Sequence, residues 1–365
     1  MGFFRRRPSR SGRSFGAVAG IFLLAGAASL LTWNENRAVA VAGALSEGGL
    51  AAQEAPADRV DPALEGKLVH VAGELTVPAV PADPDFPALR VPAGTVRLQR
   101  LVETYQTQEV QSRGGSISYR QVWFSDMMDS AHTQQPGGPQ KPQGRYRALR
   151  LVAPEAALGA YRLDGGLLRA LGGGEGIVLA DDVAGALPDM WRQGNTVYVG
   201  QAPQAPQIGD QRLAWEAVHP GSVGVIARQR GAGFVPYKAR TGASVYLIAA
   251  GRVRAGEMIA TAEEANGGAT WFGRFAGAGL TYLSLFLLLR WLVILDAVHP
   301  KLSAILDEGA AQAAAVLTLF AVPVVIAAAW LWMQVTGGAV MLAAGAACIW
   351  LATRLVRARQ ASRHL

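Results

Sequence analysis

The feature that most constrains this chain is residues 309–353, a run of 45 residues with no charged side chain. A helix needs about 20 apolar residues to cross roughly 30 Å of hydrocarbon, so the run is long enough for two membrane spans. Gly337-Gly338 predicts a tight turn between spans at 309–336 and 338–353. Pro323 predicts a kink and not a helix end, because neighbouring helices can satisfy the carbonyl that a proline frees.

Two further apolar runs predict two more spans, at 14–33 and 272–295. Arg290 lies near one end of the second run, where a long side chain can reach the lipid headgroups. Cleavage of the first run as a signal peptide near Ala38-Val39-Ala40 is the alternative. It is disfavoured because the run is longer than a usual signal core and the polar segment WNENR separates it from that site.

Arginines cluster beside the first and last spans and are predicted to hold both chain ends in the cytoplasm. Both ends lie on the same side of the membrane only if the number of spans is even, and the four predicted spans meet this condition. Residues 1–13 and 354–365 are then cytoplasmic tails, 296–308 a cytoplasmic connection, and 34–270 an extracytoplasmic domain, with Glu35 and Arg37 just outside the membrane. The side chains assigned to topology or to the membrane interface are Arg5, Arg6, Arg7, Arg10, Arg13, Trp33, Glu35, Arg37, Arg290, Arg354, Arg357 and Arg359.

The formal charge of +7 does not indicate a nucleic-acid partner. Residues 34–270 hold 22 basic and 24 acidic residues and net −2, so the remaining residues net +9, and the excess belongs to the membrane flanks. The lipid bilayer is the partner that this distribution predicts. Cys348 is the single cysteine, which excludes an intramolecular disulfide. The abundance of Ala, Gly and Arg favours a bacterial source.

The extracytoplasmic region is predicted to be rich in β-strands, which makes the chain an α+β membrane protein. The first helix is expected to continue beyond Trp33 and to end before Gly48-Gly49. Residues 51–62 are then a linker. Short apolar runs between glycines and prolines predict strands at 67–71, 96–105, 119–124, 146–152, 196–199, 212–218, 223–226 and 244–249. Residues 134–144, QQPGGPQKPQG, read as a loop because prolines exclude a central strand.

Small residues recur at four-residue spacing in the predicted spans. They are Gly16, Gly20, Gly273, Gly277, Ala339, Ala343 and Ala347. This spacing lets helix backbones approach closely, either within a bundle or between protomers. Together with unpaired strand edges, it predicts a homo-oligomer.

No catalytic, cofactor-binding or metal-binding constellation is predicted. The five histidines do not form a metal motif, and the GGGEG segment at 172–176 fits neither a Walker loop nor a dinucleotide fingerprint. His70 is interpreted as a structural strand residue. Asp126 and Asp129 are read as solvated surface, and His132, in its Gln-rich loop, is the one histidine worth testing as a ligand.

From WNENRAV onward the chain resembles the LUMA family, also called transmembrane protein 43. The resemblance rests on EGKLVHVAGEL (65–75), VRLQRLVETYQ (96–106), LGAYRL (158–163), the GD pair at 209–210 and ASVYLIAAGRVRAGEM (243–258). Departures are Asn36 where the family usually has Gly, Thr107 where it usually has Trp, and the absence of Asn-Pro after His132.

The resemblance implies a role in nuclear-envelope organisation in animals, in the endoplasmic reticulum and inner nuclear membrane, with lamin and emerin as partners. For a bacterial member we carry over membrane scaffolding, binding to other membrane proteins, self-association and a periplasmic domain. The alternatives are a channel or transport accessory subunit, and a periplasmic enzyme that uses the His132 loop. Spans without acidic residues near their centres disfavour ion transport.

Overall fold

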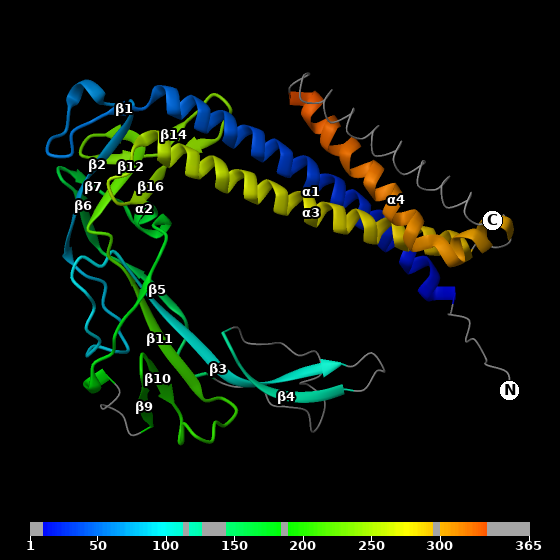
Figure 1. Cartoon of the computed structure of the whole chain (residues 1–365), viewed down its shortest axis with the longest axis horizontal. Helices are drawn as coiled ribbons and strands as arrows, with labels where there is room; N and C mark the ends of the chain where they lie inside the picture. Colours follow the sequence, from blue (N-terminus) through cyan, green and yellow to red (C-terminus); the bar gives the residue numbers. More distant parts are fainter. Residues whose placement is uncertain (1–9, 112–116, 126–143, 184–188, 295–299, 334–365) are drawn as a thin grey trace, which may run out of the picture. The chain divides into compact units, whose positions relative to one another are not determined.

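The computed structural model describes residues 10–111, 117–125, 144–183, 189–294 and 300–333 (Figure 1). These residues form an α+β protein with three long helices and many short strands. The chain divides into a helical unit (Met1–Glu47, Lys238–Ala243 and Ala260–Leu365) and a β-rich unit (Gly48–Tyr237 and Ser244–Ile259). The β-rich unit is therefore narrower than the predicted region 34–270, because both ends of that region are helical.

Two of the helices are about twice as long as a membrane requires. Helix α1 (Arg10–Ala51) has 42 residues and α3 (Ala255–Ile294) has 40. At 1.5 Å per residue each measures roughly 60 Å, against about 30 Å of hydrocarbon. The expected continuation of the first helix to Gly48-Gly49 is confirmed. The stretch of α3 before residue 272 was not predicted, because Glu263, Glu264 and Gly267-Gly268 interrupt its apolar pattern.

Helices α1 and α3 run antiparallel and pack through small and polar residues (Figure 1). A Cβ added to Gly277 would collide with Leu31, and one added to Gly20 would lie 2.9 Å from Leu288. Five of the buried residues of α1 recur at three-, four- and seven-residue steps, as in a coiled coil. They are Ala27, Leu31, Asn34, Ala38 and Leu45.

Helix α4 (Pro300–Met333) is the third long helix and continues through Pro323. Among the described residues, three helices are long and apolar enough to cross a bilayer, with candidate spans at Val18–Ala51, Ala255–Trp291 and Gly309–Trp330. The fourth predicted span, 338–353, lies outside the described residues.

The first sheet of the β-rich unit closes on itself. Its ring consists of β2 (Leu68–Ala79), β6 (Glu155–Leu158), β7 (Tyr161–Arg162), β13 (Gly233–Val235) and β12 (Ser222–Arg230), and β12 pairs back onto β2. Strands β1 (Gln53–Glu54) and β16 (Leu247–Ala250) extend it. The core inside includes Val69, Val225 and Phe234, together with Leu167 and Leu168 of α2 (Gly165–Ala170), whose N-cap is Asp164.

The second sheet is built on two long strands, β3 (Arg97–Gln111) and β11 (Gln211–Val218), in the order β4-β3-β11-β10-β9. Its other members are β4 (Ile117–Phe124), β10 (Thr196–Val199), β9 (Met190–Gln193), β5 (Leu149–Val152) and β8 (Glu175–Gly176). Trp215 is 1% exposed at its centre. The indole of Trp215 donates to Asp83 at 2.8 Å, and Asp83 also pairs with the buried Arg100 at 2.7 Å.

Each of the eight predicted strand runs contains a strand. The strands that were not predicted are short, such as β7 and β13, and become strands only because neighbours in the ring provide their hydrogen bonds. The remaining elements are β14 (Tyr237–Lys238), β15 (Ser244–Val245), and the 3₁₀ turns η1 (Pro62–Leu64) and η2 (Asp181–Val183). Most of the predicted QQPGGPQKPQG loop lies outside the described residues.

Candidate functional site

The helical unit contains a carboxylate that is completely buried between three helices. Glu35 of α1 has no exposed surface. Arg274 of α3 donates from Nε and Nη2 to its two oxygens, at 2.8 Å each. Trp330 of α4 donates from its indole Nε1 at 2.8 Å. One carboxylate therefore joins α1, α3 and α4.

A second set of hydrogen bonds continues this cluster along α1 and α3. Asn34 donates to the Thr270 carbonyl at 3.0 Å. Asn266 donates to the Ala38 carbonyl at 3.0 Å and accepts from Arg37 at 3.2 Å. We call Asn34, Glu35, Arg37, Asn266, Thr270, Arg274 and Trp330 the helix-junction cluster. Because its bonds fall at three successive levels, they fix the register of α1 against α3.

Exposed aromatic side chains lie at the same level of the helices as this cluster. Trp33 is 61% exposed on α1, and Trp271, Phe272 and Phe275 are exposed on α3. The Arg274 guanidinium also lies 4.9 Å from the centre of the Trp271 ring. Tryptophan is enriched where a membrane helix meets the headgroups. The cluster is thus positioned near the end of the apolar segments and not at their centre.

The chemistry of the helix-junction cluster is structural. Glu35 accepts hydrogen bonds from Arg274, Trp330 and, at 3.4 Å, from Asn34. Arginine also cannot give up its proton in proteins. Such a saturated carboxylate does not serve as a general base, but it does hold its three partners together. A buried ion pair of this kind supplies specificity of packing more than net stability.

The predicted packing glycines divide into two groups. Gly20, Gly273 and Gly277 lie against the opposite helix of the same chain, where a Cβ on Gly273 would overlap Asn34. A Cβ on Gly16 would meet nothing within 4 Å. Ala339, Ala343 and Ala347 lie outside the described residues.

The residues assigned to topology lie in different parts of the helical unit, and half of them lie outside the described residues. Arg10 and Arg13 begin α1, and Arg290 is exposed near the end of α3. Arg37 was expected just outside the membrane and belongs to the helix-junction cluster. Arg5, Arg6, Arg7, Arg354, Arg357 and Arg359 lie outside the described residues, as do Asp126, Asp129 and His132.

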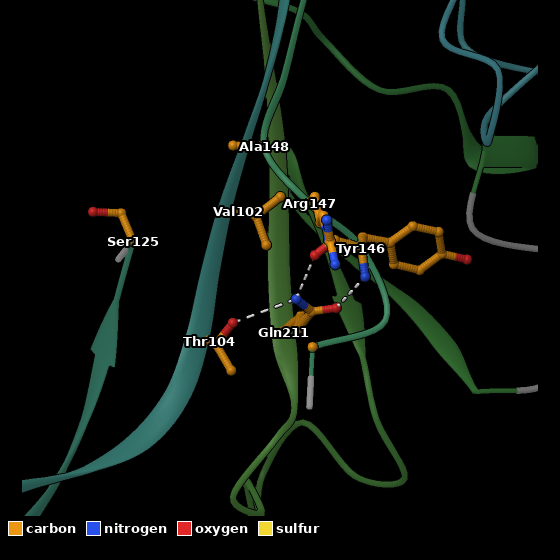
Figure 2. A pocket seen from close by; sticks show the side chains of 8 residues that line it. Val102, Thr104, Ser125, Tyr146, Arg147, Ala148 and Gln211 are labelled. Carbon is orange, nitrogen blue, oxygen red and sulfur yellow. Dashed lines mark hydrogen bonds between the residues drawn. The ribbon is translucent and has the colours of Figure 1, made fainter. Parts of the chain in front are cut away.

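A pocket of about 530 Å³ lies in the β-rich unit, beside β3 and β11 (Figure 2). The Gln211 amide is buried in its wall and donates to Thr104 and to the Tyr146 carbonyl, at 3.3 and 2.9 Å. The Gln211 oxygen accepts from the Tyr146 backbone N–H at 2.8 Å. Burial raises the pKa of the Tyr146 phenol. The polar groups of this wall satisfy one another, so they stabilise the strand contact.

Among the described residues, no group of three or more His, Cys, Asp or Glu side chains could hold a metal ion. His70 is a buried strand residue, as interpreted from the sequence. His219 lies 3.7 Å from Glu175 at the end of the GGGEG segment.

Sequence reasoning missed five members of the helix-junction cluster: Asn34, Asn266, Thr270, Arg274 and Trp330. One signal was available, because Arg274 is a charged residue at the start of an apolar run and Glu35 ends another. Two opposite charges at matched ends of two membrane helices predict a pair if the helices are antiparallel neighbours.

The fold and the cluster define a multi-pass membrane protein whose helices carry a β-rich domain. The family model described as transmembrane protein 43 matches residues 100–335. The chain belongs to this family, as its sequence motifs predicted.

Relatives in three animals match nearly the whole chain. Transmembrane protein 43 of Mus musculus is 27% identical over 91% of this chain and 87% of its own length. The Homo sapiens protein is 28% identical with the same coverage. A transmembrane protein 43 homolog of Drosophila melanogaster is 26% identical over 93% of this chain and 95% of its own length. No solved structure matches the chain.

Proposed function

We propose that this membrane protein is a scaffold that self-associates and binds other membrane proteins through its β-rich domain. The observation that carries the proposal is the helix-junction cluster, which joins three helices through one carboxylate with saturated hydrogen bonds and fixes the register of α1 against α3. Helices joined in this way suit a protein that anchors a domain in a membrane.

The proposed topology has four spans, with both chain ends in the cytoplasm and the β-rich domain in the periplasm of a bacterial inner membrane. In a eukaryotic cell the equivalent location is the endoplasmic reticulum and inner nuclear membrane, with the domain in the lumen. The charge distribution supports it, because residues 34–270 net −2 and the flanks net +9. The cytoplasmic connection at 296–308 and the fourth span at 338–353 are part of this proposal.

The surface proposed for self-association is the two-stranded arm formed by the ends of β3 and β4. Strand β3 pairs with β11 only as far as Thr104, whereas β4 continues to pair with β3 up to Gln111. Exposed apolar side chains line this arm: Val110 (41%), Tyr119 (54%) and Phe124 (41%). An isolated two-stranded ribbon is marginally stable in water, so a further strand would stabilise it.

Among the described residues, no strand pairs with the outer edge of β4, and the occupant that we propose for this edge is the β4 strand of a second copy. Strand β4 contains neither lysine nor proline, the residues that commonly block edge pairing. An antiparallel register that places Arg120 opposite its own copy sets like charges together. If the register is shifted by one residue, Gln121 lies opposite Gln121 of the second copy. Tyr119 of each copy then lies opposite Trp123 of the other, which is a favourable aromatic pair. The second register is the one that we propose.

Light scattering in mild detergent tests self-association through the mass of the particle. We expect at least two chains of 38.4 kDa each. Gln121→Lys and Gln121→Glu should each reduce the particle mass, because each places like charges at the two-fold axis. Mixing the two variants should restore it. Gln201→Lys, at another exposed position of the same unit, should leave the mass unchanged.

Two outcomes distinguish self-association itself from the β4 edge as its interface. A wild-type particle with the mass of one chain at every workable concentration would exclude self-association. A wild-type oligomer that neither Gln121 variant weakens would move the interface to another surface.

A further inference from the structure

His70 is held in an arrangement that differs from that of an ordinary buried histidine. Its side chain is 5% exposed, and both ring nitrogens face oxygen acceptors. Nδ1 lies 2.7 and 2.9 Å from the two carboxylate oxygens of Glu54. Nε2 lies 3.0 Å from the carbonyl oxygen of Val253.

These contacts determine the protonation state that satisfies the ring. A neutral imidazole has one N–H donor and one bare nitrogen, whereas the imidazolium has two donors. A carbonyl oxygen only accepts hydrogen bonds. The Glu54 carboxylate, which is 76% exposed to water, likewise only accepts hydrogen bonds when it is ionised. Only the imidazolium makes both hydrogen bonds.

The two acceptors lie next to the ends of the two long helices. Glu54 follows α1, which ends at Ala51, and it pairs with His70 in a parallel register. Val253 precedes α3, which begins at Ala255. The ring of His70, on β2 of the first sheet, therefore joins the segment that leaves one helix to the segment that begins the other.

Gly224 of β12 leaves the space that this contact requires. A Cβ at Gly224 would lie 3.2 Å from the Val253 oxygen, 3.1 Å from the sulfur of Met258 and 3.6 Å from His70 Nε2. The groups that face the ring are thus Glu54, the Val253 carbonyl, the thioether of Met258 and a glycine. The neighbouring Arg252 is directed to Glu74 at 2.8 Å, and Arg254 is exposed. Glu54 is the charged partner.

We propose that His70 is a proton-dependent clasp that fastens the start of α3 to the first sheet. When the ring carries both protons, it binds Glu54 and Val253 together. When the second proton leaves, the charge-assisted bond to the Glu54 carboxylate is the stronger of the two and keeps the remaining N–H. Nε2 then presents a lone pair to the Val253 oxygen, and the start of α3 is released. Histidine is the side chain that titrates between about pH 5 and 8, which suits such a switch. The inference depends on this geometry and not on the proposed scaffold function.

The first test uses the wild-type full chain in detergent micelles, with ¹⁵N-labelled histidine observed by NMR. His70, identified by loss of its signals in His70→Gln, should pass from two protonated ring nitrogens to one as the pH rises, and the proton that remains should be on Nδ1, beside Glu54. A His70 ring with one bare nitrogen at every pH at which the protein is folded would overturn the proposal.

The second test compares two exposed glutamates of the same sheet. Glu54→Gln keeps an acceptor but removes the charge, so His70 should lose its proton at a lower pH than in the wild type. Glu74→Gln is the matched control, since Glu74 is 72% exposed and pairs with Arg252. It should leave the titration of His70 unchanged. Equal effects of the two variants would contradict the assignment of Glu54 as the partner.

The third measurement reports release of the helix. Amide hydrogen exchange, expressed as protection relative to the unstructured rate, should fall about tenfold for the first turn of α3 as His70 loses its proton, the change expected for loss of one hydrogen bond. The variant His70→Gln should show low protection that no longer depends on pH. Protection that stays constant in the wild type through the titration of His70 would exclude the clasp.

Discussion

At the scale of single residues, buried ionic groups of this protein connect segments that are distant in sequence. Glu35 and Arg274 are 239 positions apart, and Trp330 is 295 positions from Glu35. In the β-rich unit, Arg100 and Asp83 form a buried pair only 17 positions apart, and the distant partner is Trp215, which donates to the same carboxylate from 132 positions away. A buried ion pair contributes little net stability, but the loss of one partner leaves an unpaired charge.

This asymmetry predicts the behaviour of the Glu35 pair. Arg274→Met should lower the free energy of unfolding in detergent by about 3 to 5 kcal/mol, because it leaves the Glu35 carboxylate buried without its main partner. The double variant Glu35→Met with Arg274→Met should recover most of the loss. Denaturant titration measures the wild type, Arg274→Met, Glu35→Met and the double variant. A double variant as unstable as the sum of the two single variants would show that the residues act independently.

A second residue-level prediction concerns alkaline pH. Burial raises the pKa of the Tyr198 phenol, and the hydrogen bond that the phenol donates to the Asp210 carboxylate raises it further. A raised pKa in the folded state gives stability that is present below the unfolded value of about 10 and is lost as pH rises through the folded value. Above about pH 10 the wild type should therefore lose unfolding free energy more steeply than Tyr198→Phe. Parallel curves for the two proteins would contradict this prediction.

At the scale of elements, α1 and α3 behave as one unit because their contact surface is made of small residues. Leu31 lies where a Cβ on Gly277 would need to be, so the backbones approach at this level. Without a hydrophobic effect between helices in lipid, such close contact and the hydrogen bonds of the helix-junction cluster provide the association.

Two glycines of α3 offer a matched comparison. Gly277→Leu should lower the unfolding free energy by about 1 to 3 kcal/mol, because the new side chain separates the helices. Gly279→Leu should have little effect, since nothing lies within 4 Å of its Cβ position. Thermal unfolding in detergent, followed by circular dichroism, distinguishes them. Equal stability of the two variants would show that α1 and α3 do not need this contact.

At the scale of the whole molecule, the proposed topology predicts which side of the membrane each part of the chain faces. After Cys348→Ala, a cysteine at Ala205 in the β-rich unit should react with an impermeant thiol reagent in intact spheroplasts. A cysteine at Ser9 should not react until the membrane is opened, because one span separates the two positions in the proposed topology. Reaction of both in intact spheroplasts would exclude that topology.

The sequence by itself determined the class of protein, the family, the apolar segments of the described long helices and eight strand runs, because these depend on local properties: charge-free length, alternation and glycine or proline punctuation. It also selected Trp33, Glu35 and Arg37, which end an apolar run. Only the tertiary structure decided what these residues contact. Glu35 was expected beside the membrane surface and is buried between Arg274 and Trp330, and His70 read as an ordinary strand residue although its ring joins Glu54 to Val253. Partners separated by more than a hundred positions leave no periodic pattern in one sequence, since a hydrogen bond depends on where the fold places two atoms and not on their spacing along the chain.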